Sequence, residues 1–225
     1  MSGNIFFTSD THYDHSNVIR FSRRPQFQEG DEVLNEAGKH VWASKEIADA
    51  RVKQMNEEML EAHNELVRPG DTVYHLGDFI YPKGRKADAT KRVEWWVKQL
   101  HGHYHWVFGN HDYGPARRAE GFASKQYYKE LRNIGEGKDM FVLMHYAMRV
   151  WNKRHHGAIH LYGHSHGNLP QSPNSLSWDV GVDCNDMVPV HIYEVLRRVK
   201  ETKALMDVQC INWRGEDHHT NEGVD

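Results

Sequence analysis

The stretch NIFFTSDTH (residues 4–12) begins with a short apolar run and ends with two polar residues that can bind a metal. Residues 4–8 are rich in β-branched and aromatic side chains and predict a strand, and Asp10 and His12 follow directly after it. Ligands in layered α/β folds bind beyond the carboxyl ends of the strands. The stretch therefore predicts one strand of such a fold together with the start of a site.

The same arrangement recurs along the rest of the chain. Further runs that predict strands lie at residues 72–76, 106–108, 140–144 and 158–162. Each run leads to polar residues that can bind a metal, namely Asp78, Asn110, His145, and His164 with His166. A sixth run, residues 178–182, ends at Asp183 and is expected to border the same site. We expect these groups, far apart in sequence, to converge at one edge of the fold.

Helical periodicity appears between the predicted strands. Apolar residues recur at helical spacing in residues 47–67 and again in residues 90–100, which predicts two amphipathic helices. A third helix is predicted near residues 194–203. Strands alternating with helices indicate the α/β class.

The segments outside these elements indicate one domain with a short tail. Residues 25–44 and 172–177 are predicted to be loops, and residues 215–225 a disordered tail. No Pro-, Gly- or Ser-rich linker divides the chain. Residues 1–214 therefore predict a single domain.

The composition limits the classes of partner. The 225 residues include 28 basic and 31 acidic side chains, a net charge of −3, so nucleic acid is a possible but not a favoured partner. No segment has the ~18 apolar residues of a membrane span, and the first residues lack the pattern of a secretory signal. Cys184 and Cys210 give neither a disulfide framework nor a thiolate zinc site. These features predict a cytoplasmic protein with no membrane partner.

Seven residues form the predicted metal centre: Asp10, His12, Asp78, Asn110, His145, His164 and His166. Imidazole nitrogen combined with carboxylate and amide oxygen, without sulfur, suits Mn, Fe, Zn or Ni better than Ca or Mg. Two divalent cations with two carboxylates and a bridging hydroxide keep a net positive charge, which attracts phosphate. Two ions ~3.5–4 Å apart can activate that hydroxide for in-line attack on a phosphoester.

Asp78 and His111 are the predicted catalytic residues. His111 directly follows Asn110, and we expect it to act as a general acid that protonates the leaving oxygen. A catalytic histidine usually needs a carboxylate or a carbonyl group to fix its tautomer. Asp112 and Asp183 are both candidates for that role, and the sequence does not choose between them.

Five ordered motifs resemble the calcineurin-like metallophosphoesterase superfamily, whose pattern is D-x-H, G-D, G-N-H-D, a single H and G-H-x-H. They are Asp10-Thr11-His12, Gly77-Asp78, Gly109-Asn110-His111-Asp112, His145 and Gly163-His164-Ser165-His166. The resemblance implies an α/β (α+β) fold, a β-sandwich flanked by helices in αββα layers. It implies two divalent ions, with Mn as the first choice. One ion would be bound by Asp10, His12 and His166, the other by Asn110, His145 and His164, with Asp78 as the bridge.

Longer segments are similar to the small bacterial and phage phosphoesterases of this superfamily, among them SDTHYDHSNVIRF (residues 9–21) and IHLYGHSHG (residues 159–167). By this similarity four residues are expected on the substrate side: His15, Asn17, Arg149 and Trp151. Arg149 could hold phosphate oxygens in a bidentate manner. For His15, Asn17 and Arg149, an ordinary place in a loop or at a helix start is an equal alternative.

Three functions are compatible with these motifs. The first is hydrolysis of phosphodiester or phosphomonoester bonds in small nucleotide-type substrates. The second is a nuclease or nucleic-acid end-processing phosphoesterase, which uses the same metal chemistry. The third is a non-catalytic metal-binding scaffold, which would be expected to lack ligands or the histidine of G-N-H-D, and this chain lacks neither.

Overall fold

The computed structural model describes residues 3–81, 88–134, 139–173 and 175–208. The first sheet consists of β1 (Ile5–Thr8), β4 (Thr72–His75), β5 (His103–Val107), β6 (Ser124–Gln126) and β11 (Val190–His191). The second consists of β7 (Tyr128–Ile134), β8 (Asp139–Met144), β9 (Ile159–Tyr162) and β10 (Ser177–Asp179). The strand orders are β11-β1-β4-β5-β6 and β10-β9-β8-β7.

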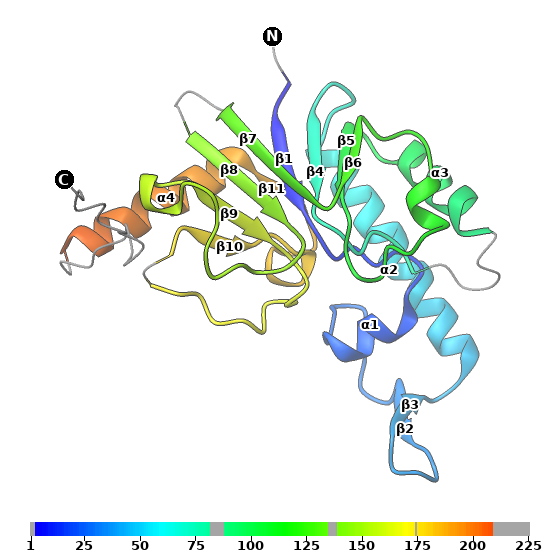
Figure 1. Cartoon of the computed structure of the whole chain (residues 1–225). Helices are drawn as coiled ribbons and strands as arrows, with labels where there is room; N and C mark the ends of the chain where they lie inside the picture. The colour runs from blue at the N-terminus through cyan, green and yellow to red at the C-terminus, as the bar shows by residue number, and fades with distance from the viewer. Residues whose placement is uncertain (1–2, 82–87, 135–138, 174, 209–225) are drawn as a thin grey trace, which may run out of the picture.

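Four α-helices surround the sheets within the described residues (Figure 1). They are α1 (Ser16–Phe21), α2 (Lys45–Leu66), α3 (Ala89–Gln99) and α4 (Ile192–Val208). A separate hairpin is formed by β2 (Glu32–Leu34) and β3 (His40–Trp42). The predicted α/β fold of sheets flanked by helices is thus confirmed.

Parallel pairing brings the carboxyl ends of the strands to one edge of the molecule. In the first sheet β1 runs parallel to β4 and β4 to β5, so that Phe6 lies opposite Val73 and Val73 opposite Tyr104. In the second sheet β8 and β9 are also parallel. A parallel bridge between Ser9 and Gly181 joins the two sheets just beyond β1. The loops that follow these strands therefore meet.

Alternate residues of the first sheet face different layers. Phe6 and Tyr104 belong to a core shared with α2 and α3, whereas Phe7 belongs to the core between the two sheets. This alternation follows from the two-residue period of a strand. Phe7 stacks on Phe141 of the second sheet, with ring centroids 5.5 Å apart. The first sheet is therefore buried on both faces.

The two helices predicted from periodicity are confirmed as α2 and α3. The Ser44 hydroxyl caps α2 by accepting a hydrogen bond from the Ile47 N–H at 3.2 Å. Val52, Met55 and Met59 form its buried face, and burial of each such side chain contributes ~1.5–3 kcal/mol. The third predicted helix is confirmed within the longer α4, which packs into the core between the sheets.

The prediction of a loop at residues 25–44 is wrong where β2 and β3 pair. The hairpin lies outside both sheets and leaves Val33 and Leu34 exposed, so no buried periodicity marks it. Ion pairs anchor it instead, because Glu32 accepts a hydrogen bond from Arg23 at 2.8 Å. Short contacts of this kind leave no regular sequence pattern.

Other boundaries also differ from the prediction. The run at residues 178–182 is a strand only as far as Asp179, and this strand begins at Ser177, which was predicted to be in a loop. Helix α1 and strands β6, β7 and β11 were not predicted. They are short or carry many polar side chains, so tertiary pairing decides them rather than hydrophobic pattern.

Two further expectations concern the membrane and the tail. Within the described ranges, none of the helices has the length and apolar character needed to cross a membrane. Residues 215–225, predicted to be a disordered tail, lie outside the described residues.

Candidate metal centre

The seven residues predicted to bind metal lie at the carboxyl ends of five strands. Asp10 and His12 follow β1, Asp78 follows β4, Asn110 follows β5, His145 follows β8, and His164 and His166 follow β9. Backbone hydrogen bonds hold the first two loops side by side. The Asp10 N–H donates to the Gly77 carbonyl at 2.9 Å, and the His12 N–H donates to the Asp78 carbonyl at 3.0 Å.

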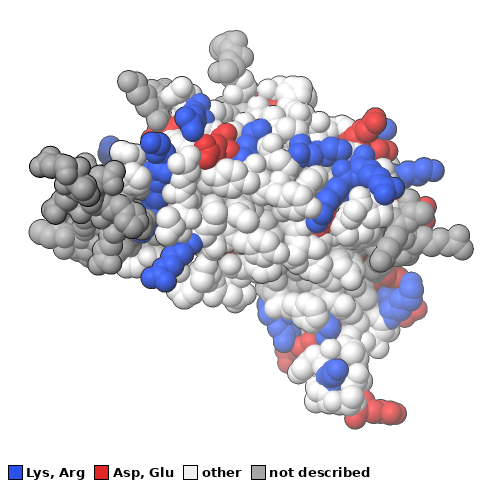
Figure 2. All heavy atoms as spheres, in the orientation of Figure 1, with Lys and Arg blue, Asp and Glu red and all other residues white. Residues whose placement is uncertain are grey.

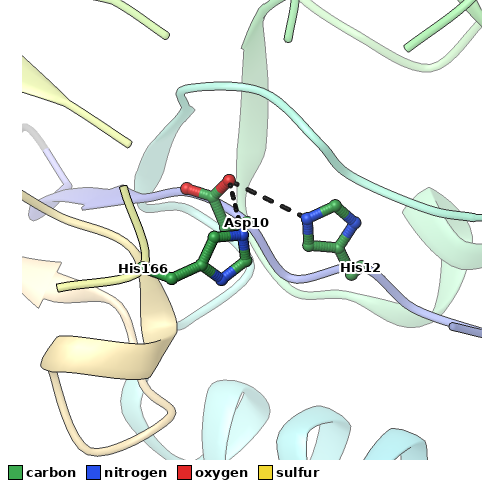
Figure 3. Close-up of side chains that lie close together, drawn as sticks. All are labelled: Asp10, His12 and His166. Atoms are coloured by element: carbon green, nitrogen blue, oxygen red, sulfur yellow. Dashed lines mark ion pairs between the residues drawn. The ribbon is translucent and has the colours of Figure 1, made fainter. Parts of the chain in front are cut away.

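Asp10, His12 and His166 form a first ligand group (Figure 3). Asp10 Oδ1 lies 3.9 Å from His12 Nε2 and 3.8 Å from His166 Nε2. Ligand atoms that bind one ion at ~2.0–2.2 Å are at most ~4.4 Å apart, so these three atoms have the spacing of a single site. Asp10 Oδ1 is buried and has no hydrogen-bond partner among the described residues. A cation would satisfy it.

Asp78, His145 and His164 form a second ligand group, with ligand atoms within 4.8 Å of one another. His145 Nδ1 lies 2.8 Å from the Leu76 carbonyl oxygen. Because a carbonyl only accepts, Nδ1 carries the proton and Nε2 presents a lone pair. Nε2 lies 2.9 Å from Asn110 Oδ1. Two ligands at right angles around one ion are ~3.0 Å apart, so this spacing also fits a shared cation.

Asp78 lies between the two groups. Its Oδ2 is 3.5 Å from His12 Nε2 and 3.6 Å from His145 Nε2. Its Oδ1 accepts a hydrogen bond from the His111 N–H at 2.8 Å, which fixes the orientation of the carboxylate. One oxygen of Asp78 is therefore within reach of ions at either group.

Five of the seven residues have a left-handed backbone conformation. They are Asp10 (φ 56°), His12 (46°), Asp78 (55°), His164 (67°) and His166 (47°). Such a conformation costs about 1–3 kcal/mol in a residue with a Cβ atom and is concentrated at functional sites. The packed strands below these loops must supply that free energy.

Two glycines allow the close approach of the ligand loops. A Cβ atom at Gly109 would lie 2.2 Å from Asp78 Oδ1, and one at Gly163 would lie 2.3 Å from Asp10 Oδ2. Both distances are far below van der Waals contact. Any side chain at these positions would displace a carboxylate of the centre.

The family model described as calcineurin-like phosphoesterase matches residues 3–223. The chain belongs to the calcineurin-like phosphoesterase family. An uncharacterized protein of Methanocaldococcus jannaschii is 24% identical to this chain over 209 residues, which cover 91% of this chain and 96% of the relative. The crystal structure of a protein of unknown function from Aquifex aeolicus has a TM-score of 0.56 and 20% identity, and covers 87% of this chain and 99% of that one. A phosphoesterase from E. coli, YfcE, aligns with a TM-score of 0.35 and 15% identity over 79% of this chain and 78% of that one.

The predicted superfamily is thereby confirmed, and the similarity to the Aquifex aeolicus structure supports the same fold. The finer similarity to small bacterial and phage members stays a prediction.

Burial dominates the electrostatics of the candidate metal centre. Burial raises the pKa of Asp10 from 3.8 to about 7. Burial, with the nearby Asp112 and Asp10 carboxylates, raises the pKa of Asp78 from 3.8 to about 8. Burial also lowers the pKa of His145 to about 4 and that of His12 well below its usual value. A divalent cation would reverse the shifts of the carboxylates, because it supplies the positive charge they lack.

A buried arginine without any sequence motif stabilises the first ligand group. Arg24 donates to both carboxylate oxygens of Asp183, at 2.8 and 3.0 Å, and to the carbonyl oxygens of Asp10 and Thr11, at 2.7 and 2.9 Å. Asp183 Oδ2 lies 2.6 Å from His166 Nδ1. Burial opposes the protonation of His166, but the hydrogen bond of Asp183 and the charge of Asp10 raise its pKa. Asp183 therefore orients His166, with Nε2 toward Asp10.

Asp112 holds two ligand loops together. Its Oδ2 accepts hydrogen bonds from the backbone N–H groups of Asp78 at 2.8 Å and Gly109 at 2.7 Å. Its Oδ1 accepts a hydrogen bond from the backbone N–H of Phe79 at 3.0 Å. Asp112 and Asp183 were the two candidates for orienting His111. Both carboxylates instead form their hydrogen bonds with other groups. Their observed contacts give them positioning roles elsewhere in the centre.

His111 belongs to a group of partly exposed rings beside the centre. Its ring centroid is 5.3 Å from that of His12 and 5.7 Å from that of Tyr81. His15, expected on the substrate side, stacks on Tyr81 with centroids 4.1 Å apart. Burial, and then the charges of two other histidines of the centre, lowers the pKa of His111. Tyr81 was not predicted, and its position beside His15 and His111 adds it to the rim of the site.

The other residues expected on the substrate side have different surroundings. Asn17 lies in the first turn of α1, where its Oδ1 accepts a long hydrogen bond from Arg20 at 3.5 Å. Arg149 is exposed in the loop after β8. Trp151 is buried, and its indole N–H donates to the Ala158 carbonyl at 2.9 Å. The expectation that Trp151 lines the substrate side is therefore wrong.

Proposed function

We propose that this chain uses two divalent cations to hydrolyse phosphodiester or phosphomonoester bonds in small nucleotide-type substrates. The observation that carries the proposal is the position of Asp78, whose Oδ2 lies 3.5 Å from His12 and 3.6 Å from His145. A carboxylate shared by two groups of ligand atoms is the arrangement that two neighbouring ions need. Membership of the calcineurin-like phosphoesterase family supports the reaction class.

The donor atoms suit divalent transition metals. The first group offers one carboxylate and two imidazoles, and the second adds the amide oxygen of Asn110 to two imidazoles and the shared Asp78. Nitrogen and oxygen ligands without sulfur favour Mn, Fe, Zn or Ni. Mn is our first choice, by the family resemblance. The buried Oδ1 of Asp10 has no hydrogen-bond partner in the described part of the chain, and this also supports a bound cation, because a buried acceptor without a partner is costly.

When bound, the ions would lower the pKa of a water molecule and stabilise charge on the phosphoryl oxygens. We assign His111 the role of donating a proton to the leaving oxygen, because its ring is partly exposed and adjoins that of His12. The pKa of His111 is lowered in the free protein, chiefly by burial. The negative charge of a bound phosphoester would raise it again and so favour the protonated form.

The distribution of charge supports small substrates rather than long nucleic acids. The net charge is −3. On the face shown in Figure 2, basic side chains lie in separate groups at the left, the upper right and the lower right, with acidic ones beside several of them, around an uncharged middle. Proteins that bind long polyanions without sequence preference carry a continuous basic surface.

A substrate panel tests the proposal. Metal-free protein is supplied with Mn, Zn, Fe or Ni and assayed on nitrophenyl phosphate, bis-nitrophenyl phosphate, cyclic nucleotides and single-stranded oligonucleotides. We expect metal-dependent hydrolysis of the small esters, which Asp78→Asn abolishes and Asp31→Asn, outside the centre, retains. Preferred cleavage of oligonucleotides with a strong salt dependence would identify a nuclease instead. Metal binding without hydrolysis of any ester would identify a scaffold.

A further inference from the structure

A cavity of about 310 Å³ is lined in part by the chain segments that carry His145 and His164. Its wall includes Ala147, two residues after His145, and Tyr162, two residues before His164. The segments that carry these two histidines therefore also form one side of the cavity. Its volume is at the lower end of the range for small-molecule sites.

The polar lining of the cavity is cationic. Arg149 and Arg154 both contribute to it, together with Ser172, Ser175 and Ser177. Among the described residues that line the cavity there is no carboxylate. Guanidinium and hydroxyl groups together are the usual donors to carboxylate and phosphate oxygens.

One of the two arginines rests on a fixed platform. The Arg154 guanidinium lies over the ring of Trp151, 5.4 Å from its centroid. Trp151 is itself held in the core by the hydrogen bond from its indole N–H to the Ala158 carbonyl. The buried ring limits the freedom of the cation above it, so less entropy is lost when an anion binds.

The remaining lining is apolar and suits a carbon skeleton. Met148, Leu169 and Pro170 contribute to this part of the wall. An inorganic anion would make no use of these side chains, whereas an organic group bearing an anion would contact both parts of the lining.

We propose that this cavity is a subsite for a second anionic group, a carboxylate or a further phosphate, on the organic part of the phosphoester. The inference rests on the proposed function, in which the metal centre holds the phosphoryl group that reacts. The preferred substrate class is then an organic phosphoester with a second negative charge, rather than a neutral alkyl or aryl phosphate.

The test compares phenyl phosphate with carboxyphenyl phosphate, which differ by one carboxylate. We expect Arg154→Gln and Arg149→Gln to lower the preference for the carboxylated ester, measured as the ratio of the two kcat/KM values, about tenfold, or ~1.4 kcal/mol. Arg197→Gln removes an exposed arginine of α4 that pairs with Glu194, and should leave the ratio unchanged. Since Arg149 is exposed, its variant keeps the test valid if Arg154→Gln fails to fold.

A binding measurement on the metal-free protein separates this subsite from the catalytic proposal. Calorimetric titration with hydroxybenzoate and with phenol should show a preference for the carboxylate in the unchanged protein and in Arg197→Gln, and its loss in Arg149→Gln and Arg154→Gln. A different result is hydrolysis of phenyl phosphate with no change, in either arginine variant, in the ratio of kcat/KM values or in the binding preference for hydroxybenzoate over phenol. That result refutes the subsite and leaves the proposed function standing. If no ester is hydrolysed with any metal, the proposed function fails, and the titration still decides the subsite.

Discussion

Replacement of Asp78 by asparagine should affect metal binding and the stability of the metal-free protein in opposite directions. The amide has nearly the same shape, and its Oδ1 can keep the hydrogen bond from the His111 N–H. Its NH₂ group can donate toward the Nε2 lone pairs of His12 and His145, which lie 3.5 and 3.6 Å from the present Oδ2. The amide lacks only the negative charge that two cations would share. Asp78→Asn is therefore expected to lose the ions and the activity that depends on them.

The expected gain in stability follows from the pKa of Asp78. Burial, and then the Asp112 and Asp10 carboxylates, raises this pKa from 3.8 to about 8. A carboxyl group with a raised folded-state pKa contributes stability below pH 3.8 that is lost as the pH rises through about 8. One pH unit in this window corresponds to ~1.36 kcal/mol. At about pH 7 the metal-free Asn variant should therefore be more stable by up to ~4 kcal/mol, and at about pH 4 by almost nothing.

Urea unfolding of EDTA-treated protein, followed by circular dichroism, measures this difference at about pH 4 and about pH 7. Asp31→Asn is the matched control. A hydrogen bond from Arg51 lowers the pKa of Asp31, so the same substitution there should reduce stability at neutral pH. Equal unfolding free energies of Asp78→Asn and the unchanged protein at both pH values would refute the electrostatic argument. An unchanged metal content in Asp78→Asn would refute the bridging role.

Three further substitutions probe other parts of the centre. His111→Ala should keep the bound ions, because the hydrogen bond of His111 to Asp78 comes from the backbone N–H, which alanine retains. Steady-state assays should show a larger loss on esters with poor leaving groups than on nitrophenyl esters, and equal losses would contradict its role as general acid. Gly109→Ala would place a Cβ atom 2.2 Å from the Asp78 carboxylate, and calorimetric titrations should show metal binding weakened about tenfold or more. Gly114→Ala is the control: its Cβ atom would meet no atom within 4 Å, and metal binding should be unchanged. Arg24→Met breaks a buried ion pair and should lower the unfolding free energy by about 3–5 kcal/mol in urea, and a loss below ~1 kcal/mol would show that this pair is not needed for stability.

Regular spacing along the chain was enough to predict several elements. The run before Asp10 and the buried face of α2 at Val52, Met55 and Met59 could be identified because strand and helix periods place apolar residues on one face. The seven candidate metal ligands could be singled out because each follows a strand and belongs to an ordered motif. These features depend on neighbours in the chain.

The contacts that hold the centre together depend on tertiary packing and could not be predicted. Arg24 and Asp183 are 159 positions apart, and neither residue type nor spacing marks them as partners. The carboxylate of Asp112 was a candidate for orienting the His111 ring, and it instead accepts hydrogen bonds from backbone N–H groups of two loops. The physical reason is that such contacts arise where parallel strands of two packed sheets bring distant loops together. No local periodicity in the sequence indicates which of these side chains will contact one another.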